Sequence, residues 1–194
     1  MLGHIGGGGP VSLAARPLIH VSRNAHMNVV ALAGRRSETE AWLRSLLGAA
    51  NLPEQGVVRY RHWNSEVDAS ASYEASRLEN QAPQLVVAKS LGTVIAAIAY
   101  RDHRFRPATA VLVGTPFQAI ESDELVALQQ FAAGVETLFI QQSEDPGGSA
   151  ASLSAGLGLV RGEVASVPGS DHRYSDTSAL VTAIGRWKHR PLGL

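Results

Sequence analysis

Short apolar runs rich in valine alternate with longer segments that carry alanine and leucine at helical spacing, starting at residue 27. Such runs are typical of strands buried on both faces, and strands that alternate with helices form parallel sheets. The sequence therefore predicts an α/β fold, with one three-layer α/β/α domain over residues 27–194 around a mostly parallel six-stranded sheet. Strands are expected at 28–33, 56–63, 84–89, 110–114, 137–142 and 163–167.

Helices are expected at 38–47, 67–80, 91–102, 123–132 and 177–189, with a weaker one at 149–157. Residues 1–26 contain a run of glycines at 6–9 and no sustained periodicity. No strand precedes that run to make a phosphate-binding loop, so a flexible linker is the ordinary interpretation. We therefore expect residues 1–26 to be a disordered tail or an expression leader.

The composition excludes several classes of function. The chain has 17 basic and 17 acidic side chains, so nucleic acid is not an expected partner. Cysteine is absent, which excludes disulfides and thiolate nucleophiles and suits a reducing compartment, so a cytoplasmic location is expected. No apolar run approaches the roughly 20 residues that span a bilayer. The sequence has no His-Glu-x-x-His motif or clustered ligands, so neither a metal nor a cofactor is expected, and the oligomeric state is left open.

The most informative local motif surrounds Ser90. The apolar run at 84–89 passes through Ala88-Lys89-Ser90-Leu91-Gly92 directly into a helical segment. A serine on such a sharp strand-to-helix turn exposes its hydroxyl at the carboxyl edge of the sheet, and crowding there requires small residues two positions before and after it. The same spacing at 147–151 follows no strand directly, so the flanking elements carry the prediction. The alternative is that Ser90 only caps a helix.

This segment resembles the nucleophile elbow of the α/β-hydrolase superfamily, especially its small members similar to dienelactone hydrolase. The likeness extends from about residue 28 to the C-terminus, and the family more often has glycine at the position of Ala88. The resemblance implies a truncated core that lacks the first two strands of the family, with strand order 2-1-3-4-5-6. Lidded members carry a long insertion where this chain has only residues 115–122, so no lid is expected.

The resemblance also implies that an acid and then a histidine follow the nucleophile, each on a loop after a later strand. The loop after the strand at 137–142 offers Asp145 as the acid, with Glu144 as the main alternative. The loop after the strand at 163–167 resembles the Gly-x-Asp-His loop of the family and gives His172 as the base, while Asp171 is expected to shape that loop. Since a serine hydroxyl needs a base to become a good nucleophile, Ser90, His172 and Asp145 are expected to converge.

The family takes its oxyanion donors from the amide after the nucleophile and from the loop after the first core strand. By this resemblance the donors are the amides of Leu91 and Arg35, although alanine stands at residue 33 where the family often has histidine. Ser37 is also expected to cap the following helix, with Glu40 as its capping-box partner.

The resemblance and the strand ends suggest a pocket formed by Gly34, Lys89, Thr115 and Phe117, although core packing is an equally good interpretation of the phenylalanine. Arg35 and its neighbour at residue 36 would bring positive charge to this rim and favour an anionic substrate, but exposed arginines are more commonly just solvated. His62 is a further residue of interest because it lies near the end of the second predicted strand.

These features predict a serine hydrolase that cleaves a small ester or thioester through an acyl-Ser90 intermediate, with a small-molecule acyl compound as its substrate. The same three residues would also serve a peptidase or an acyltransferase. A different class of function is a hydrolase-like scaffold that binds a ligand without turnover. The presence of Ser90, Asp145 and His172 together argues against that alternative.

Overall fold

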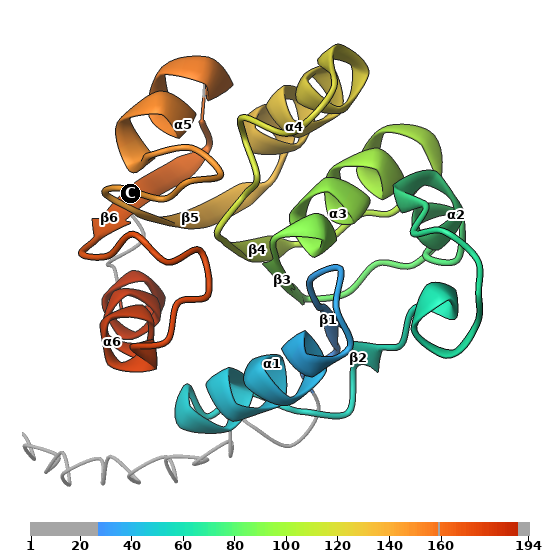
Figure 1. Ribbon diagram of the computed structural model, residues 1–194, viewed down its shortest axis with the longest axis horizontal. Coiled ribbons are helices and arrows are strands. Elements are labelled where there is room, and N and C mark those ends of the chain that lie inside the picture. Colours follow the sequence, from blue (N-terminus) through green and yellow to red (C-terminus); the bar gives the residue numbers. More distant parts are fainter. Residues whose placement is uncertain (1–26, 159, 190–194) are drawn as a thin grey trace, which may run out of the picture.

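The computed structural model describes residues 27–158 and 160–189, and the tail expected at 1–26 lies outside these ranges. The described chain forms a six-stranded sheet with helices on both faces, which is a three-layer α/β/α domain (Figure 1). Its elements are β1 (Val29–Leu32), α1 (Glu38–Ala49), β2 (Val57–Val58), the 3₁₀ helix η1 (Arg61–Asn64), α2 (Ala71–Ser76), β3 (Leu85–Lys89), α3 (Leu91–Asp102), β4 (Thr109–Val113), α4 (Ser122–Gly134), β5 (Glu136–Gln142), α5 (Ala150–Leu157), β6 (Gly162–Val167) and α6 (Thr177–Lys188).

The strand order is β2-β1-β3-β4-β5-β6, as expected, and every pair is parallel, so the sheet is wholly rather than mostly parallel. Parallel strands all end at the same edge of the sheet. The loops that follow β1, β3, β4, β5 and β6 therefore meet at one edge, and the predicted catalytic, oxyanion and pocket residues lie on or beside these loops.

Two apolar cores lie on opposite faces of the sheet, because successive side chains of a strand point to opposite sides. In β1, Val30 and Leu32 belong to the core under α2, α3, α4 and α5, whereas Val29 and Ala31 belong to the core under α1 and α6. Figure 1 shows the same division, with α1 and α6 on one side of the sheet and the other helices opposite them.

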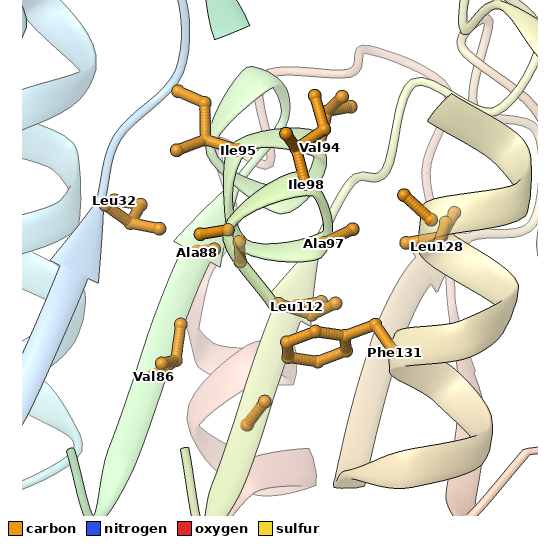
Figure 2. Close-up of a cluster of buried hydrophobic side chains, with 14 of the residues drawn as sticks. Leu32, Val86, Ala88, Val94, Ile95, Ala97, Ile98, Leu112, Leu128 and Phe131 are labelled. Carbon is orange, nitrogen blue, oxygen red and sulfur yellow. The ribbon is translucent and has the colours of Figure 1, made fainter. Parts of the chain in front are cut away.

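Helix α3 is the most deeply buried helix, and its bounds agree with the predicted 91–102. Residues 92–99 are all buried, since α3 is enclosed by the sheet, α2 and α4. Figure 2 shows Ile98 and Ala97 above Leu112 of β4, with Phe131 and Leu128 of α4 beside them. Ser90 therefore lies between a buried strand and a buried helix, and its backbone has little freedom to move.

Two predicted elements are shorter in the structure. The strand expected at 56–63 pairs with β1 only at Val57 and Val58, after which the chain turns into η1. The helix expected at 67–80 covers only Ala71–Ser76; Ser70 caps its start by accepting from the Tyr73 amide, and Asn80 has a φ of 59°. Within the described ranges, no helix combines the length and the apolar character needed to cross a membrane.

Candidate active site

Ser90 connects β3 to α3 in an unusual backbone conformation, with φ 50° and ψ −119°. A residue other than glycine at positive φ is strained and persists only where its surroundings enforce it. The start of α3 packs closely against the end of β1, because a Cβ atom added at Gly92 would lie 2.3 Å from the Leu32 carbonyl oxygen. The requirement for a small residue two positions after the serine therefore has a direct steric cause.

The Ser90 side chain does not cap α3, so the simple helix-cap interpretation is wrong. Ser149, in the second segment with the same spacing, is an ordinary cap: its hydroxyl accepts from the Ser152 amide at the start of α5. The strand that directly precedes Ser90 therefore distinguishes it from Ser149, as the sequence suggested.

The three residues predicted to converge do so. The Ser90 Oγ lies 3.0 Å from the Nε2 atom of His172, and the Nδ1 atom of the same ring lies 2.7 Å from the Oδ1 atom of Asp145. These side chains come from the loops after β3, β6 and β5, in that order. Glu144 is exposed, whereas Asp145 is buried against the histidine, so the structure selects Asp145 over its neighbour.

Asp145 accepts three hydrogen bonds. The Gly147 amide and the His172 ring share its Oδ1 atom, and the Tyr174 hydroxyl donates to its Oδ2 atom over 2.7 Å. Burial alone would raise the pKa of the Asp145 carboxyl, but these hydrogen bonds outweigh burial and hold the pKa below its ordinary value. The carboxylate is thus ionised at neutral pH and accepts from Nδ1–H, which leaves Nε2 of a neutral ring free to accept the Ser90 proton.

The loop that carries His172 has left-handed backbone conformations at two residues, with φ 47° at His172 and 60° at Tyr174. Asp171 holds it in place by accepting from the Arg173 and Tyr174 amides and from the Gln142 side chain. These hydrogen bonds lower the pKa of the Asp171 carboxyl well below its ordinary range, and the one from the Gln142 side chain has the largest effect. The sequence prediction that Asp171 shapes the loop is therefore confirmed.

Lys89, which precedes Ser90, also contacts this loop. Its Nζ atom donates to the His172 carbonyl oxygen over 2.8 Å and lies 4.7 Å from the ring centre of Tyr174 and 5.9 Å from that of Trp42. Burial lowers the pKa of Lys89 to about 8, although Asp145 acts in the opposite direction. The ammonium group therefore connects β3, α1 and the histidine loop.

Aromatic residues in η1 and just before it hold the loop after β1 in place by hydrogen bonds. The Arg35 carbonyl oxygen accepts from the Nε2 atom of His62 at 2.7 Å and from the Nε1 atom of Trp63 at 3.0 Å. The Tyr60 hydroxyl donates to the Ala33 carbonyl oxygen at 2.7 Å. His62 thus lies in η1 rather than in a strand, and it contacts the loop that was predicted to supply an oxyanion donor.

The predicted oxyanion residues lie on either side of Ser90. Leu91 is the first residue of α3, so its amide has no acceptor within the helix. Gly34 approaches Ser90 closely, since a Cβ atom added there would lie 3.5 Å from the Ser90 Cβ. Arg35 follows Gly34 and lines the same pocket as Ser90.

The capping box predicted at the start of α1 is absent, because the Ser37 side chain makes no capping hydrogen bond. Glu40 instead forms ion pairs with Arg44 and Arg59. The Arg36 carbonyl oxygen is satisfied locally by the amide of Thr39. The loop after β1 is therefore held by backbone hydrogen bonds and the aromatic residues of η1 rather than by the predicted cap.

A pocket of about 640 Å³ opens beside Ser90. The loop after β1, the first turns of α1, the end of β3 and the histidine loop form its walls. Its lining residues are Gly34, Arg35, Arg36, Glu38, Thr39, Trp42, Lys89, Ser90, His172 and Arg173.

Of the four residues predicted to form a pocket, Gly34 and Lys89 line this one, whereas Thr115 and Phe117 do not. Thr115 is fully buried, with its amide bonded to the Gln141 side chain. The ring of Phe117 packs against Gly156 of α5, within the apolar core on the face opposite to α1. The periodicity of the sequence does not indicate on which face of the sheet a strand-end loop will pack.

Sequence reasoning also missed several residues around the site. Tyr174 orients the acid, and Trp42 and Thr39 form part of the pocket wall. Two features of the sequence could have indicated the pocket residues. Arg173, which also lines the pocket, directly follows the predicted base. Thr39 and Trp42 are three residues apart on the helix that begins after the predicted oxyanion loop, so they share one face. Tyr174 gave no such signal, because its role depends on contacts across the fold.

Compared with known proteins, the chain matches no protein-family model, no curated protein and no solved structure. The described residues also contain no group of three or more histidine, aspartate and glutamate side chains able to hold a metal ion.

Proposed function

We propose that this protein is a serine hydrolase of the α/β-hydrolase kind, and that it cleaves small esters or thioesters through an acyl-Ser90 intermediate. The observation that carries this proposal is the hydrogen-bonded chain from Ser90 through His172 to the ionised Asp145. The strained backbone of Ser90, whose hydroxyl faces a pocket instead of capping its helix, supports the same interpretation.

In the proposed acylation step, Ser90 Oγ forms a bond to the carbonyl carbon of the substrate while its proton moves to Nε2 of His172. The negative charge that develops on the carbonyl oxygen is stabilised by the amides of Leu91 and Arg35. Asp145 stabilises the imidazolium formed at the same time. The tetrahedral intermediate then collapses: the bond to the leaving oxygen or sulfur breaks, and the proton of His172 passes to the leaving group.

In the deacylation step, water takes the place of the leaving group. His172 removes a proton from the water as the water oxygen bonds to the acyl carbon, and the bond to Ser90 Oγ breaks as that proton returns to the serine. The products are a carboxylic acid and the regenerated enzyme. No group beyond substrate and water is required, so the proposal includes no cofactor.

The connection from β4 to α4 covers only residues 114–121, which leaves little chain to fold over the pocket. We therefore propose a small, open-site enzyme with a small acyl compound as substrate. The chain has no cysteine, and a cytoplasmic location is part of the proposal. Matched ester, thioester and amide substrates would distinguish esterase, thioesterase and peptidase activity, and an added alcohol acceptor would reveal acyl transfer.

A fluorophosphonate probe tests the proposal, because it reacts covalently only with activated serines. The wild-type protein should take up one probe, mapped to Ser90 by peptide mass spectrometry, and Ser90→Ala should take up none. Ser149→Ala is the matched control, since Ser149 has the same neighbouring spacing but only caps α5, and it should be labelled like the wild type. A folded wild-type protein without labelling would refute the hydrolase and favour a binding scaffold.

A further inference from the structure

The pocket beside Ser90 is lined by an unbalanced set of charges. Arg35, Arg36, Arg173 and Lys89 contribute four cationic groups, and Glu38 contributes the single anionic group. The chain as a whole has a formal net charge of zero. The positive charge is therefore a local feature of this pocket and does not reflect the overall composition.

The three arginines of the pocket also lack ion-pair partners. Within the described ranges, no carboxylate lies within ion-pairing distance of Arg35, Arg36 or Arg173, and all three are exposed. Elsewhere on the surface, arginines commonly do have such partners: Arg77 pairs with Glu74, and Arg101 pairs with two aspartates. The guanidinium groups of the pocket are thus available to an external anion.

The arginines reach the pocket from two segments that lie far apart in the sequence. Arg35 and Arg36 follow β1, whereas Arg173 follows the proposed base after β6. Single exposed arginines are usually just solvated, but like charges gathered around a cleft with low-dielectric walls focus the field into it. This cleft also holds Ser90 and His172, so an anion bound there would lie beside the proposed nucleophile.

We propose that the natural substrate of this site is an ester or thioester that carries an anionic oxygen group, a carboxylate or a phosphate, bound by Arg36 and Arg173. This inference rests on the proposed hydrolase function and deepens it by naming the substrate class. Guanidinium groups suit both anions, because their paired N–H donors match two acceptor oxygens. Trp42 offers an apolar wall for the short chain between the ester and the charge, and the volume of about 640 Å³ suits a small molecule.

The test compares p-nitrophenyl esters that have acyl chains of equal length and different terminal charge: the half-ester of adipic acid, the hexanoate, and the 6-(trimethylammonio)hexanoate. We expect kcat/KM to fall in that order, and we expect the advantage of the anionic ester to shrink at high ionic strength. A second pair, 4-carboxyphenyl and 4-carbamoylphenyl butyrate, places the charge in the leaving group. A preference for the anion in either set supports the inference, and which set shows it indicates the side of the ester that faces the arginines.

Arg36→Gln and Arg173→Gln should each lower the ratio of anionic to neutral kcat/KM about three- to fivefold, which is the size expected for one exposed charge contact. The matched control is Arg161→Gln, which removes an exposed arginine just before β6, at the opposite edge of the sheet, and should leave the ratio unchanged. Equal rates for anionic and neutral esters in both sets, with ratios that the arginine variants do not change, would overturn the inference.

Direct binding separates this inference from the proposed function. Hexanoate and pentyl phosphate, titrated calorimetrically into the wild type and into the Arg36→Gln/Arg173→Gln double variant, contain no carboxylic ester, so they report anion binding without turnover and distinguish the two anions. If no ester is hydrolysed and the probe does not label Ser90, the proposed function fails. Binding of either anion that the double variant loses would still support the anionic site, and no binding of either anion to the wild type would refute it.

Discussion

At the scale of single residues, the proposed mechanism depends on a carboxylate that fixes one tautomer of a histidine. Asp145 contacts Nδ1 of His172 at 2.7 Å, while the neighbouring Glu144 is exposed. We expect Asp145→Asn to lower kcat about 10³- to 10⁴-fold, because an amide can hold the ring in the wrong tautomer and cannot stabilise an imidazolium. Glu144→Gln should stay close to wild type. Ester hydrolysis by the two purified variants checks this, and equal losses would show that neither acid has the proposed role.

Gly92 offers a steric test of the turn around Ser90. In Gly92→Ala the new methyl group would meet the Leu32 carbonyl oxygen at 2.3 Å, so α3 must shift away from β1. We expect a loss of roughly 1–3 kcal/mol of unfolding free energy, as for overpacked cores, together with slower fluorophosphonate labelling. Gly185→Ala in α6 is the control, since nothing lies within 4 Å of its added Cβ and a helical alanine should stabilise by up to about 1 kcal/mol. A Gly92→Ala protein with wild-type stability and labelling would contradict the steric account.

Lys89 should leave a signature in the pH dependence of stability. The unfolded chain keeps the lysine proton up to a pKa near 10.5, whereas the folded protein loses it near pH 8, because burial outweighs the attraction of Asp145 and Asp171. Between these values the unfolded state binds more protons, so stability increases with pH. The unfolding free energy of wild type minus that of Lys89→Met should therefore rise from pH 8 to 10.5, by up to about 3 kcal/mol. Urea denaturation at several pH values measures this, and a flat difference would contradict the burial of the ammonium group.

The residue scale also shows what a sequence can and cannot predict. Ser90, Asp145 and His172 were identifiable because each has a local signature: a small-residue turn after an apolar run, or an acid or histidine just after a strand. Tyr174 has no such signature, and the signal for Trp42 was limited to its position three residues after Thr39 on one helix face. Their contacts join segments far apart in the chain, and only the packing of α1 against the histidine loop brings them to the site.

At the scale of elements, most bounds were predicted to within about two residues, whereas β2 and α2 are much shorter than predicted. The bounds of α3 and β3 were close because burial on all sides leaves a continuous apolar run in the sequence. The second strand was predicted too long because Tyr60 and Trp63 are strand-favouring aromatics, but their hydroxyl and indole groups bind carbonyls of the loop after β1 instead of extending the ladder. Tertiary hydrogen bonds overrode the local preference.

That arrangement predicts a positioning role for η1. His62 and Trp63 both donate to the Arg35 carbonyl oxygen and so fix the loop whose amide is the proposed oxyanion donor. We expect Trp63→Phe to lower kcat about three- to tenfold while KM changes little, because one hydrogen bond that orients the loop is lost and the ring remains. Hydrolysis of p-nitrophenyl acetate measures the effect. Trp187→Phe in α6 is the control, and a loss confined to KM would argue against a role in the transition state.

At the scale of the whole molecule, the class and order of the sheet were predictable, but the face on which the pocket opens was not. The alternation of strands and helices predicted a parallel sheet, whereas the strand order 2-1-3-4-5-6 was implied by the resemblance to the α/β-hydrolases. The pocket lies on the side of α1, whereas Phe117 packs against the core beneath α5 on the other face. Which strand-end loop folds to which face depends on side-chain packing that periodicity does not record.

The absence of a long segment between β4 and α4 leads to a prediction about substrate size. In lidded hydrolases a large insertion at this point covers the site and buries long acyl chains, whereas here only residues 114–121 connect the two elements. Each methylene left in water forgoes about 0.8 kcal/mol of transfer free energy, so lengthening a neutral acyl chain should bring no gain once it extends past the pocket. We expect kcat/KM for p-nitrophenyl esters to stay flat or fall from acetyl through octanoyl to palmitoyl. The series is measured below the micelle-forming concentration of each ester, and a steady rise with chain length would refute the open site.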